Sequence, residues 1–312
     1  MLFEDWALGR GGLGKRVPHR EADALSGKYP EPPRLAAGRF VSVNGVGLHY
    51  IERGRGAPVV YLHGAGLLAE ELFCSPVGDA LAERYRVIAF DRPGYGHSGR
   101  DPSLSGPAAQ ARLFHSALAR LGVQRPILVG HSWSGALVLH YGAAFPEDVA
   151  GIVSLAGWSF ATHRTSLKLI SAISQGSMET ILGTPFGPKL ARRLAWDGLR
   201  HVFAPAPIPA GFESLPVELM IRASQLRATA GDIKALNADI LKIQRQYHRF
   251  RVPREVIVSA ADRVVDSDRH GRRLARVVPD ARLTEADGAG HMIHHVRPDL
   301  LMAAVARLDH FR

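Results

Sequence analysis

Short apolar runs of strand length recur along most of the chain, and helix-length stretches separate them. The runs are Val59–Leu62, Val87–Phe90, Ile127–Val129, Ile152–Leu155, Val256–Val258 and Ala281–Thr284. The helix-length stretches lie near residues 69–84, 107–122, 134–145, 268–278 and 298–309. This alternation of strand and helix predicts a mostly parallel sheet with helices on both faces, joined by right-handed crossovers.

A hairpin is predicted ahead of this alternation. Residues 40–43 and 47–51 are short β-rich runs, and Asn44-Gly45 between them is a strong signal for a tight turn. The two runs are therefore expected to pair as antiparallel strands.

The alternation stops between about Phe160 and Phe250. No strand candidate lies there, and the helical segments are broken by Pro185, Gly187 and the proline-rich run 204–209. Because the sheet pattern resumes afterwards, this stretch is interpreted as an inserted helical lid.

The chain is accordingly divided into four parts. Residues 1–36 are predicted to form an N-terminal arm, since glycine and proline punctuate them and no helix or strand period is sustained. Residues 37–159 and 251–312 are predicted to be the two parts of the α/β core. Residues 160–250 are predicted to be a helical cap inserted between them.

Composition and charge narrow the possible classes of protein. The 312 residues are 46% apolar and 22% charged, which is typical of a soluble globular protein and argues against disorder as the main state. The formal net charge of +10 raises nucleic acid as a partner. However, the arginines are scattered, with only short clusters such as Arg272-Arg273, so no nucleic-acid role is expected.

The compartment is predicted to be cytoplasmic. Cys74 is the only cysteine, so no intrachain disulfide can form. The first residues lack the pattern of a signal peptide, and no apolar stretch reaches the length of a membrane span.

The predicted arm contains a pattern that imitates a nucleotide site. Residues Gly9–Lys15 satisfy the dinucleotide-binding pattern and most of the P-loop pattern. Only eight residues precede the motif, too few for a leading strand, and Arg16 stands where a P-loop needs Ser or Thr for magnesium. We therefore expect a loop there, and no cofactor and no metal in the protein.

The stretch Gly130-His131-Ser132-Trp133-Ser134 has the form of a nucleophile elbow, with serine in the last small position. A strand is predicted before it and a helix after it, as that motif requires. Ser132 is the candidate nucleophile. A serine hydroxyl needs a base within hydrogen-bond reach, a group that orients the base, and donors for the developing oxyanion.

Loops after other strands supply these partners. His63-Gly64-Ala65-Gly66 follows the third strand, so the backbone N–H groups of Ala65 and Trp133 are the candidate oxyanion hole. His291 follows the last strand and is the candidate base, while Asp262 follows the strand before it and is the candidate acid. Nearby competitors, of which the two histidines are interpreted as structural, are His294, His295, Asp266 and Asp268.

Taken together, these motifs resemble the cap-bearing α/β-hydrolases with a serine nucleophile. The resemblance covers residues 38–312 and includes the run 91–98, which resembles the turn after the fourth strand and makes Asp91 structural. It implies an eight-stranded sheet whose second strand is antiparallel, with a helical cap after the sixth. Ser134 departs from the glycine of many members.

The resemblance also bears on the reaction. Relatives that open epoxides or displace halide use aspartate at the position of Ser132, so serine indicates acyl transfer. The predicted activity is hydrolysis of a carboxylic ester of a small to medium apolar substrate. Carbon–carbon, lactone or amide hydrolysis on the same triad remains open, as does a non-catalytic small-molecule receptor.

The candidate pocket residues lie near the same strand ends. Gly64, Gly66 and Trp158 are predicted to line the substrate pocket. Trp196, Phe203 and Met220 are assigned either to the pocket or to the packing of the cap. The expected partner is a small molecule, and the oligomeric state is left open.

Overall fold

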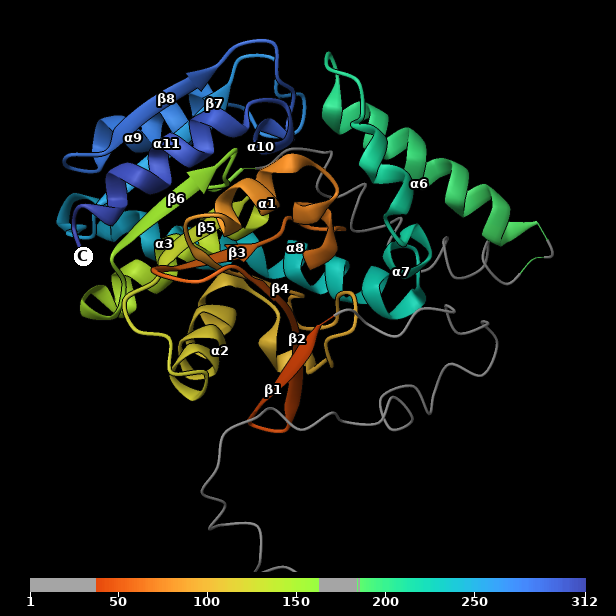
Figure 1. The fold of residues 1–312 in the computed structure, drawn as a ribbon, viewed down its shortest axis with the longest axis horizontal. Helices are drawn as coiled ribbons and strands as arrows, with labels where there is room; N and C mark the ends of the chain where they lie inside the picture. The colour runs from red at the N-terminus through yellow and green to blue at the C-terminus, as the bar shows by residue number, and fades with distance from the viewer. Residues whose placement is uncertain (1–37, 163–183, 185) are drawn as a thin grey trace, which may run out of the picture.

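A single eight-stranded sheet organises the computed structural model, which describes residues 38–162, 184 and 186–312 (Figure 1). The strands lie in the order β1-β2-β4-β3-β5-β6-β7-β8. They are β1 (Arg39–Val43), β2 (Val46–Arg53), β3 (Pro58–Leu62), β4 (Arg86–Phe90), β5 (Ile127–His131), β6 (Gly151–Leu155), β7 (Arg254–Ser259) and β8 (Arg282–Ala286). β2 pairs antiparallel with β1 and with β4, and the pairs from β4 to β8 are parallel. The predicted eight-stranded, mostly parallel sheet with an antiparallel second strand is confirmed.

Helices cover both faces because strand side chains alternate between them. In β3, Val59 and Tyr61 belong to one buried cluster, whereas Val60 and Leu62 belong to another. The first cluster includes residues of α1 (Pro76–Ala82) and α11 (Pro298–Asp309). The second includes residues of α2 (Pro107–Arg120), α3 (Trp133–Ala144), α8 (Ala223–Ile243) and α9 (Arg273–Val277).

Two of the predicted helices are divided. The stretch near 69–84 forms the 3-10 helix η1 (Ala69–Phe73) and then α1. Ser75 is extended at φ −144° and ψ 170°, because the proline at position 76 disfavours a helical conformation in the residue before it. The stretch near 268–278 forms the π-helix η7 (Asp268–Arg272) followed by α9.

The described residues between β6 and β7 contain helices and no strand. These helices are α6 (Gly187–Phe203), η5 (Ala210–Ser214), α7 (Val217–Met220), α8 and η6 (Gln244–Arg249). Figure 1 shows α6 extending away from the sheet. Phe203, Phe212 and Val217 pack in a separate small core with Leu68 and Met292, which follow β3 and β8. The insertion is thus anchored on the loops at the strand ends.

The remaining short helices are η2 (Pro102–Leu104), η3 (Pro146–Asp148) and α10 (Ile293–Val296). Within the described ranges, no helix combines the length and apolar character needed to cross a bilayer. The predicted arm of residues 1–36 with its Gly9–Lys15 motif lies outside the described residues, as do residues 163–183 and 185 of the predicted cap.

Candidate active site

Ser132 occupies a strained position between β5 and α3. Its backbone has φ 55° and ψ −117°, a sparsely populated region for a residue with a side chain that costs about 1–3 kcal/mol. The Ser132 N–H donates to Leu155 O at 2.9 Å, and the Trp158 N–H donates to Ser132 O at 3.0 Å. The end of β6 therefore holds the turn that exposes the hydroxyl.

Two glycines lie close to this serine, and a side chain is excluded at Gly130 and would be crowded at Gly64. A Cβ at Gly130 would collide with the carbonyl of Ser134. A Cβ at Gly64 would lie 3.0 Å from Ser132 Cβ and 3.1 Å from His131 Nδ1. Ser134, the departure from the family pattern, is accommodated because its Oγ donates to His63 O at 2.6 Å.

His291 and Asp262 are hydrogen bonded to each other. His291 Nδ1 lies 2.8 Å from Asp262 Oδ2, and their side chains are 5% and 1% exposed. The other Asp262 oxygen accepts from the N–H groups of Val264 and Val265 at 2.8 and 2.9 Å. An ionised carboxylate only accepts, so Nδ1 carries the proton and Nε2 keeps a free lone pair.

The two competing aspartates are engaged elsewhere. Asp268 forms an ion pair with Arg272, and Asp266 accepts from the Arg269 N–H at 3.0 Å.

The backbone of His291, the candidate base, is held by the insertion, because the His291 N–H donates to Val202 O in α6 at 2.8 Å.

Ser132 and His291 line one cavity of about 450 Å³. Gly64, Gly66 and Trp158, the predicted pocket residues, line the same cavity, as does Met220. Phe203 does not line it but packs in the small core of the insertion, and Trp196 packs against that core. The insertion supplies much of the remaining apolar wall, and polar side chains line the cavity as well. The apolar residues include Leu199, Val202, Leu226, Ile233 and Leu236, and the polar ones include His201, Thr229 and Arg263.

Ala65 and Trp133 also line the cavity, and their backbone N–H groups are available as donors. Neither N–H donates a hydrogen bond within the described part of the chain. For Trp133 the reason is its place in the first turn of α3, where backbone N–H groups have no intrahelical acceptor.

His63, at the start of the candidate oxyanion loop, is neutral. Its Nε2 accepts the Arg92 backbone N–H at 3.0 Å, so Nδ1 carries the proton and donates to Gly64 O at 2.7 Å. Burial, assisted by the Arg92 guanidinium, lowers the pKa of His63 to about 4.

A buried cluster around Glu71 includes two histidines that follow His291, and the sequence analysis did not identify it. Glu71 accepts from the Tyr61 hydroxyl, and its Oε2 lies 2.5 Å from His295 Nε2 and 3.4 Å from His294 Nε2. Burial raises the pKa of Glu71, but the two histidines hold it well below its ordinary value. Burial and His294 lower the pKa of His295 to about 4. The only local signal was the adjacent pair His294-His295, because Glu71 lies 223 residues away from His294 in the sequence.

The ligand atoms of Glu71, His131 and His294 lie within 4.8 Å of one another, close enough to be considered as ligands of one metal ion. The Glu71 oxygens are, however, already engaged by Tyr61 and His295. His131 Nε2 donates instead to His291 O at 3.2 Å. The Glu71 carboxylate is therefore held by hydrogen bonds from side chains of the protein.

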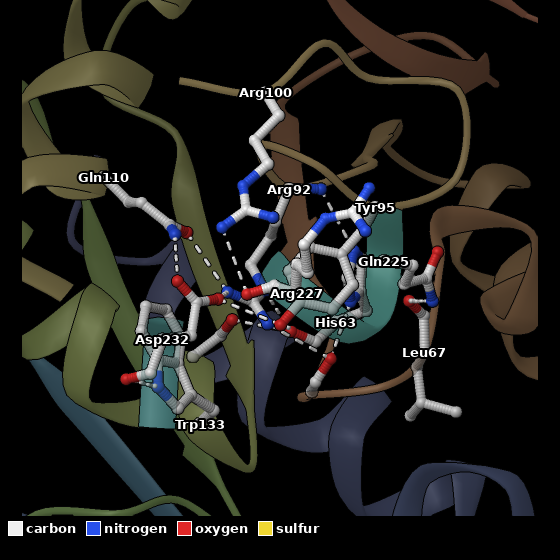
Figure 2. Close-up of polar contacts among 12 residues, drawn as sticks. His63, Leu67, Arg92, Tyr95, Arg100, Gln110, Trp133, Gln225, Arg227 and Asp232 are labelled. Carbon is white, nitrogen blue, oxygen red and sulfur yellow. Dashed lines mark hydrogen bonds and ion pairs between the residues drawn. The ribbon is translucent and has the colours of Figure 1, made fainter. Parts of the chain in front are cut away.

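A second buried network joins the core to the insertion, and sequence reasoning also missed it (Figure 2). Arg92 is fully buried, forms an ion pair with Asp232 of α8, and stacks on the Trp133 ring with its guanidinium carbon 4.2 Å from the centroid. Gln110 donates to Asp232 at 2.9 Å. Burial raises the pKa of Asp232, and Arg92 opposes that rise. The available signal was an aspartate among the apolar positions of a helix, since a buried charge needs a partner.

Asp91, expected to be structural, lies in the turn after β4. Its carboxylate accepts from the N–H groups of Ala69 and His97 at 2.7 and 2.9 Å and contacts His49 Nδ1 at 2.7 Å. Burial raises its pKa, but these hydrogen bonds and His49 hold it down at about 2.

Similarity to known proteins agrees with this architecture. The sequence profile of the alpha/beta hydrolase fold matches residues 57–298. A stretch of 139 residues is 32% identical to bifunctional epoxide hydrolase 2 of Sus scrofa; it covers 43% of this chain but 24%, about a quarter, of that relative's length.

Two solved structures have the same fold. An esterase from Exiguobacterium antarcticum superposes with a TM-score of 0.71 at 19% identity, over 87% of this chain and 99% of its own. An enol-lactonase from Burkholderia xenovorans LB400 superposes with a TM-score of 0.67 at 20% identity, over 86% of this chain and 98% of its own.

Proposed function

The chain belongs to the alpha/beta hydrolase fold family, and from this premise we propose that it hydrolyses a carboxylic ester through an acyl-enzyme on Ser132. The observation that carries the proposal is that Ser132 and His291 line one cavity while Asp262 holds the far side of the imidazole at 2.8 Å. This is the set of roles that serine hydrolysis requires.

In this mechanism His291 Nε2 removes the hydroxyl proton as Ser132 Oγ attacks the carbonyl carbon. Asp262 keeps the imidazole in the required tautomer and stabilises the imidazolium. The N–H groups of Ala65 and Trp133 donate to the oxyanion of the tetrahedral intermediate. His291 then protonates the leaving alcohol, and water, activated by the same imidazole, releases the acid.

The substrate class follows from the cavity wall. The cavity that Ser132 and His291 line is also lined by Trp158 and by apolar residues of the insertion, among them Leu199, Met220, Leu226 and Ile233. A largely apolar cavity of about 450 Å³ favours a small to medium apolar acyl or aromatic ester. We propose that residues 160–250 act as the cap that forms this wall.

Other reactions on the same three residues make up the alternative. Carbon–carbon, lactone and amide hydrolysis use the same nucleophile, base and acid, and one structural relative is named an enol-lactonase. Epoxide opening, the reaction in the name of the Sus scrofa relative, is disfavoured here because it proceeds through an alkyl ester on aspartate, and residue 132 is serine. A non-catalytic receptor would bind a ligand without a burst of product.

A fluorophosphonate probe followed by peptide mapping tests the proposal. We expect the label on Ser132, and we expect Ser132→Ala to lower kcat for a p-nitrophenyl ester by about 10⁴- to 10⁶-fold. Ser154→Ala is the matched control, because Ser154 is a buried serine on the neighbouring strand β6 that does not line the cavity. A panel of esters, lactones and amides of increasing chain length then separates the substrate classes. Labelling elsewhere, or near-normal turnover by Ser132→Ala, would refute the assignment.

A further inference from the structure

We propose that Gln225, in the first turn of α8, is a positioning residue for the oxyanion hole. It holds the loop of residues 63–67 in the conformation that turns the Ala65 N–H into the cavity. The inference rests on the proposed function and extends it, since it assigns a role in transition-state stabilisation to a side chain of the insertion.

The orientation of the Gln225 amide is determined by its partners. The side chain is fully buried, and its Oε1 accepts from the Gly96 N–H at 2.9 Å. A backbone N–H only donates, so Nε2 must lie on the opposite side of the amide. There it donates to Gly66 O and Leu67 O, both at 3.3 Å (Figure 2). Both ends of the amide are therefore used.

The beginning of the loop is held by Arg92. The Arg92 Nε donates to His63 O at 3.1 Å, and its terminal nitrogen donates to Gly64 O at 3.4 Å. In a trans peptide the carbonyl and the following N–H point in opposite directions. Because Gly64 O points to Arg92, the Ala65 N–H points away from Arg92, and Ala65 lines the cavity beside Ser132.

Gln225 is needed because the second half of the loop can rotate. Gly66 has φ 80°, and no atom lies within 4 Å of the place where its Cβ would be. A glycine in open space readily adopts other backbone conformations. The two hydrogen bonds from Gln225 to the carbonyls of residues 66 and 67 restrict that freedom.

The same helix face also holds the second candidate donor. Asp232 lies seven residues after Gln225, two turns along α8, so both side chains project from one face. Asp232 forms the ion pair with Arg92, and its backbone carbonyl accepts from the Trp133 indole N–H at 3.1 Å. α8 thus bonds the Trp133 side chain directly, and through Gln225 it bonds the two residues that follow Ala65 in the loop.

This arrangement acts on the transition state more than on the substrate. The oxyanion hole makes its strongest hydrogen bonds only when negative charge develops on the carbonyl oxygen. Displacing a donor by roughly 1 Å can cost about 10²-fold in rate. Loss of the Gln225 contacts is therefore expected to lower kcat by about 10- to 100-fold, with KM within about threefold.

The test compares Gln225→Met with Asn237→Leu. Both substitutions replace a side-chain amide of α8 by an apolar group of similar size. Asn237 likewise bonds a backbone loop, with Thr162 N and O at 3.1 and 2.6 Å, but it does not line the cavity or contact residues 63–67. Measurements are kcat and KM for a p-nitrophenyl ester, the inhibition constant of an aliphatic trifluoromethyl ketone, and thermal stability. That ketone forms a tetrahedral adduct on serine whose oxyanion needs the same donors.

The proposal is supported if Gln225→Met has a lower kcat and a correspondingly weaker inhibition by the ketone, with KM nearly unchanged. Asn237→Leu should lose thermal stability but keep the kcat and the ketone inhibition of the wild type. The proposal is overturned if Gln225→Met retains the kcat and the ketone inhibition of the wild type, or if the two variants lose kcat equally. Should Gln225→Met not fold, Gln225→Glu replaces it, because that variant keeps the acceptor for Gly96 and removes the paired donors. Ser132→Ala is measured in parallel: an active Ser132→Ala refutes the proposed function, whereas an inactive one with normal Gln225 variants refutes only this inference.

Discussion

Two buried ionic networks differ in which parts of the molecule they join. The Arg92 network connects the turn after β4 with α8 of the insertion, and it also bonds the carbonyls of the candidate oxyanion loop. The Glu71 network connects η1 with α10, directly after His291, and it includes Tyr61 and Ser75 of the core. Both networks contain a carboxylate that is buried completely or nearly so. Only the Arg92 network contacts Trp133 and the loop of Ala65, whose backbone N–H groups are the candidate oxyanion donors.

The two networks also differ in the kind of group that faces the buried carboxylate. In the Glu71 network the partners are two histidines and a tyrosine, which donate hydrogen bonds without carrying a permanent charge, so the cluster can adapt to the loss of its acid. In the Arg92 network the cation is a guanidinium, which stays charged at any relevant pH and has a fixed planar geometry. A permanent, rigid cation is suited to holding backbone carbonyls in one orientation.

The largest expected effect is that of Asp232→Asn. It leaves the buried Arg92 without its counter-charge, and breaking a buried pair from one side costs about 3–5 kcal/mol of unfolding free energy. We also expect a lower kcat in the folded fraction, because Arg92 and Trp133 both lose their fixed position. Chemical denaturation and single-substrate kinetics measure the two effects.

Glu71→Gln provides the comparison for that prediction. Its partners carry no permanent charge that would be left without a counter-charge, so the expected destabilisation is smaller, about 1–3 kcal/mol, and kcat stays within about threefold. If Glu71→Gln lowers kcat as much as Asp232→Asn does, the functional distinction between the two networks fails.

Lowering the pH is expected to have an intermediate effect on the free energy of unfolding. His63 and His295 each have a pKa lowered to about 4 by burial, one in each network, against about 6.5 in an unfolded chain. The unfolded state then binds more protons, so the stability that each group contributes is fully present above pH 6.5 and is lost as the pH falls toward 4. Each contributes roughly 3 kcal/mol over this window.

Unfolding free energies measured from pH 7.5 to 4 test this slope. His295→Gln keeps hydrogen-bonding atoms near Glu71 and Ser75 but does not titrate, so it should make the decline smaller by roughly 3 kcal/mol. A decline of the same size in wild type and variant would contradict the contribution of His295.

The smallest expected effect concerns the elbow, which packs beside the Arg92 network through Trp133. The backbone of Ser132, at φ 55° and ψ −117°, is the mirror image of an extended conformation that only glycine adopts freely. Ser132→Gly should therefore unfold with a free energy about 1 kcal/mol higher than Ser132→Ala, although both are inactive. Equal thermal stability of the two variants would show that the surrounding hydrogen bonds impose no strain.

The sequence by itself determined the features that depend on neighbouring residues. Strand periodicity located the sheet, and the small residues around Ser132 identified the elbow, since both signals act over a few positions. The pairing of Asp262 with His291 was also predictable, because the ends of neighbouring parallel strands meet at one edge of a sheet.

Only the tertiary structure decided which distant polar groups meet in the interior. Gln225 lies 158 residues from Leu67, and Asp232 lies 140 residues from Arg92. No local period relates such positions, because their contact depends on how α8 packs across α2 and α3. A helix shows in its sequence which face is apolar, but the partner of a buried polar group on that face is set by whichever surface the helix comes to cover.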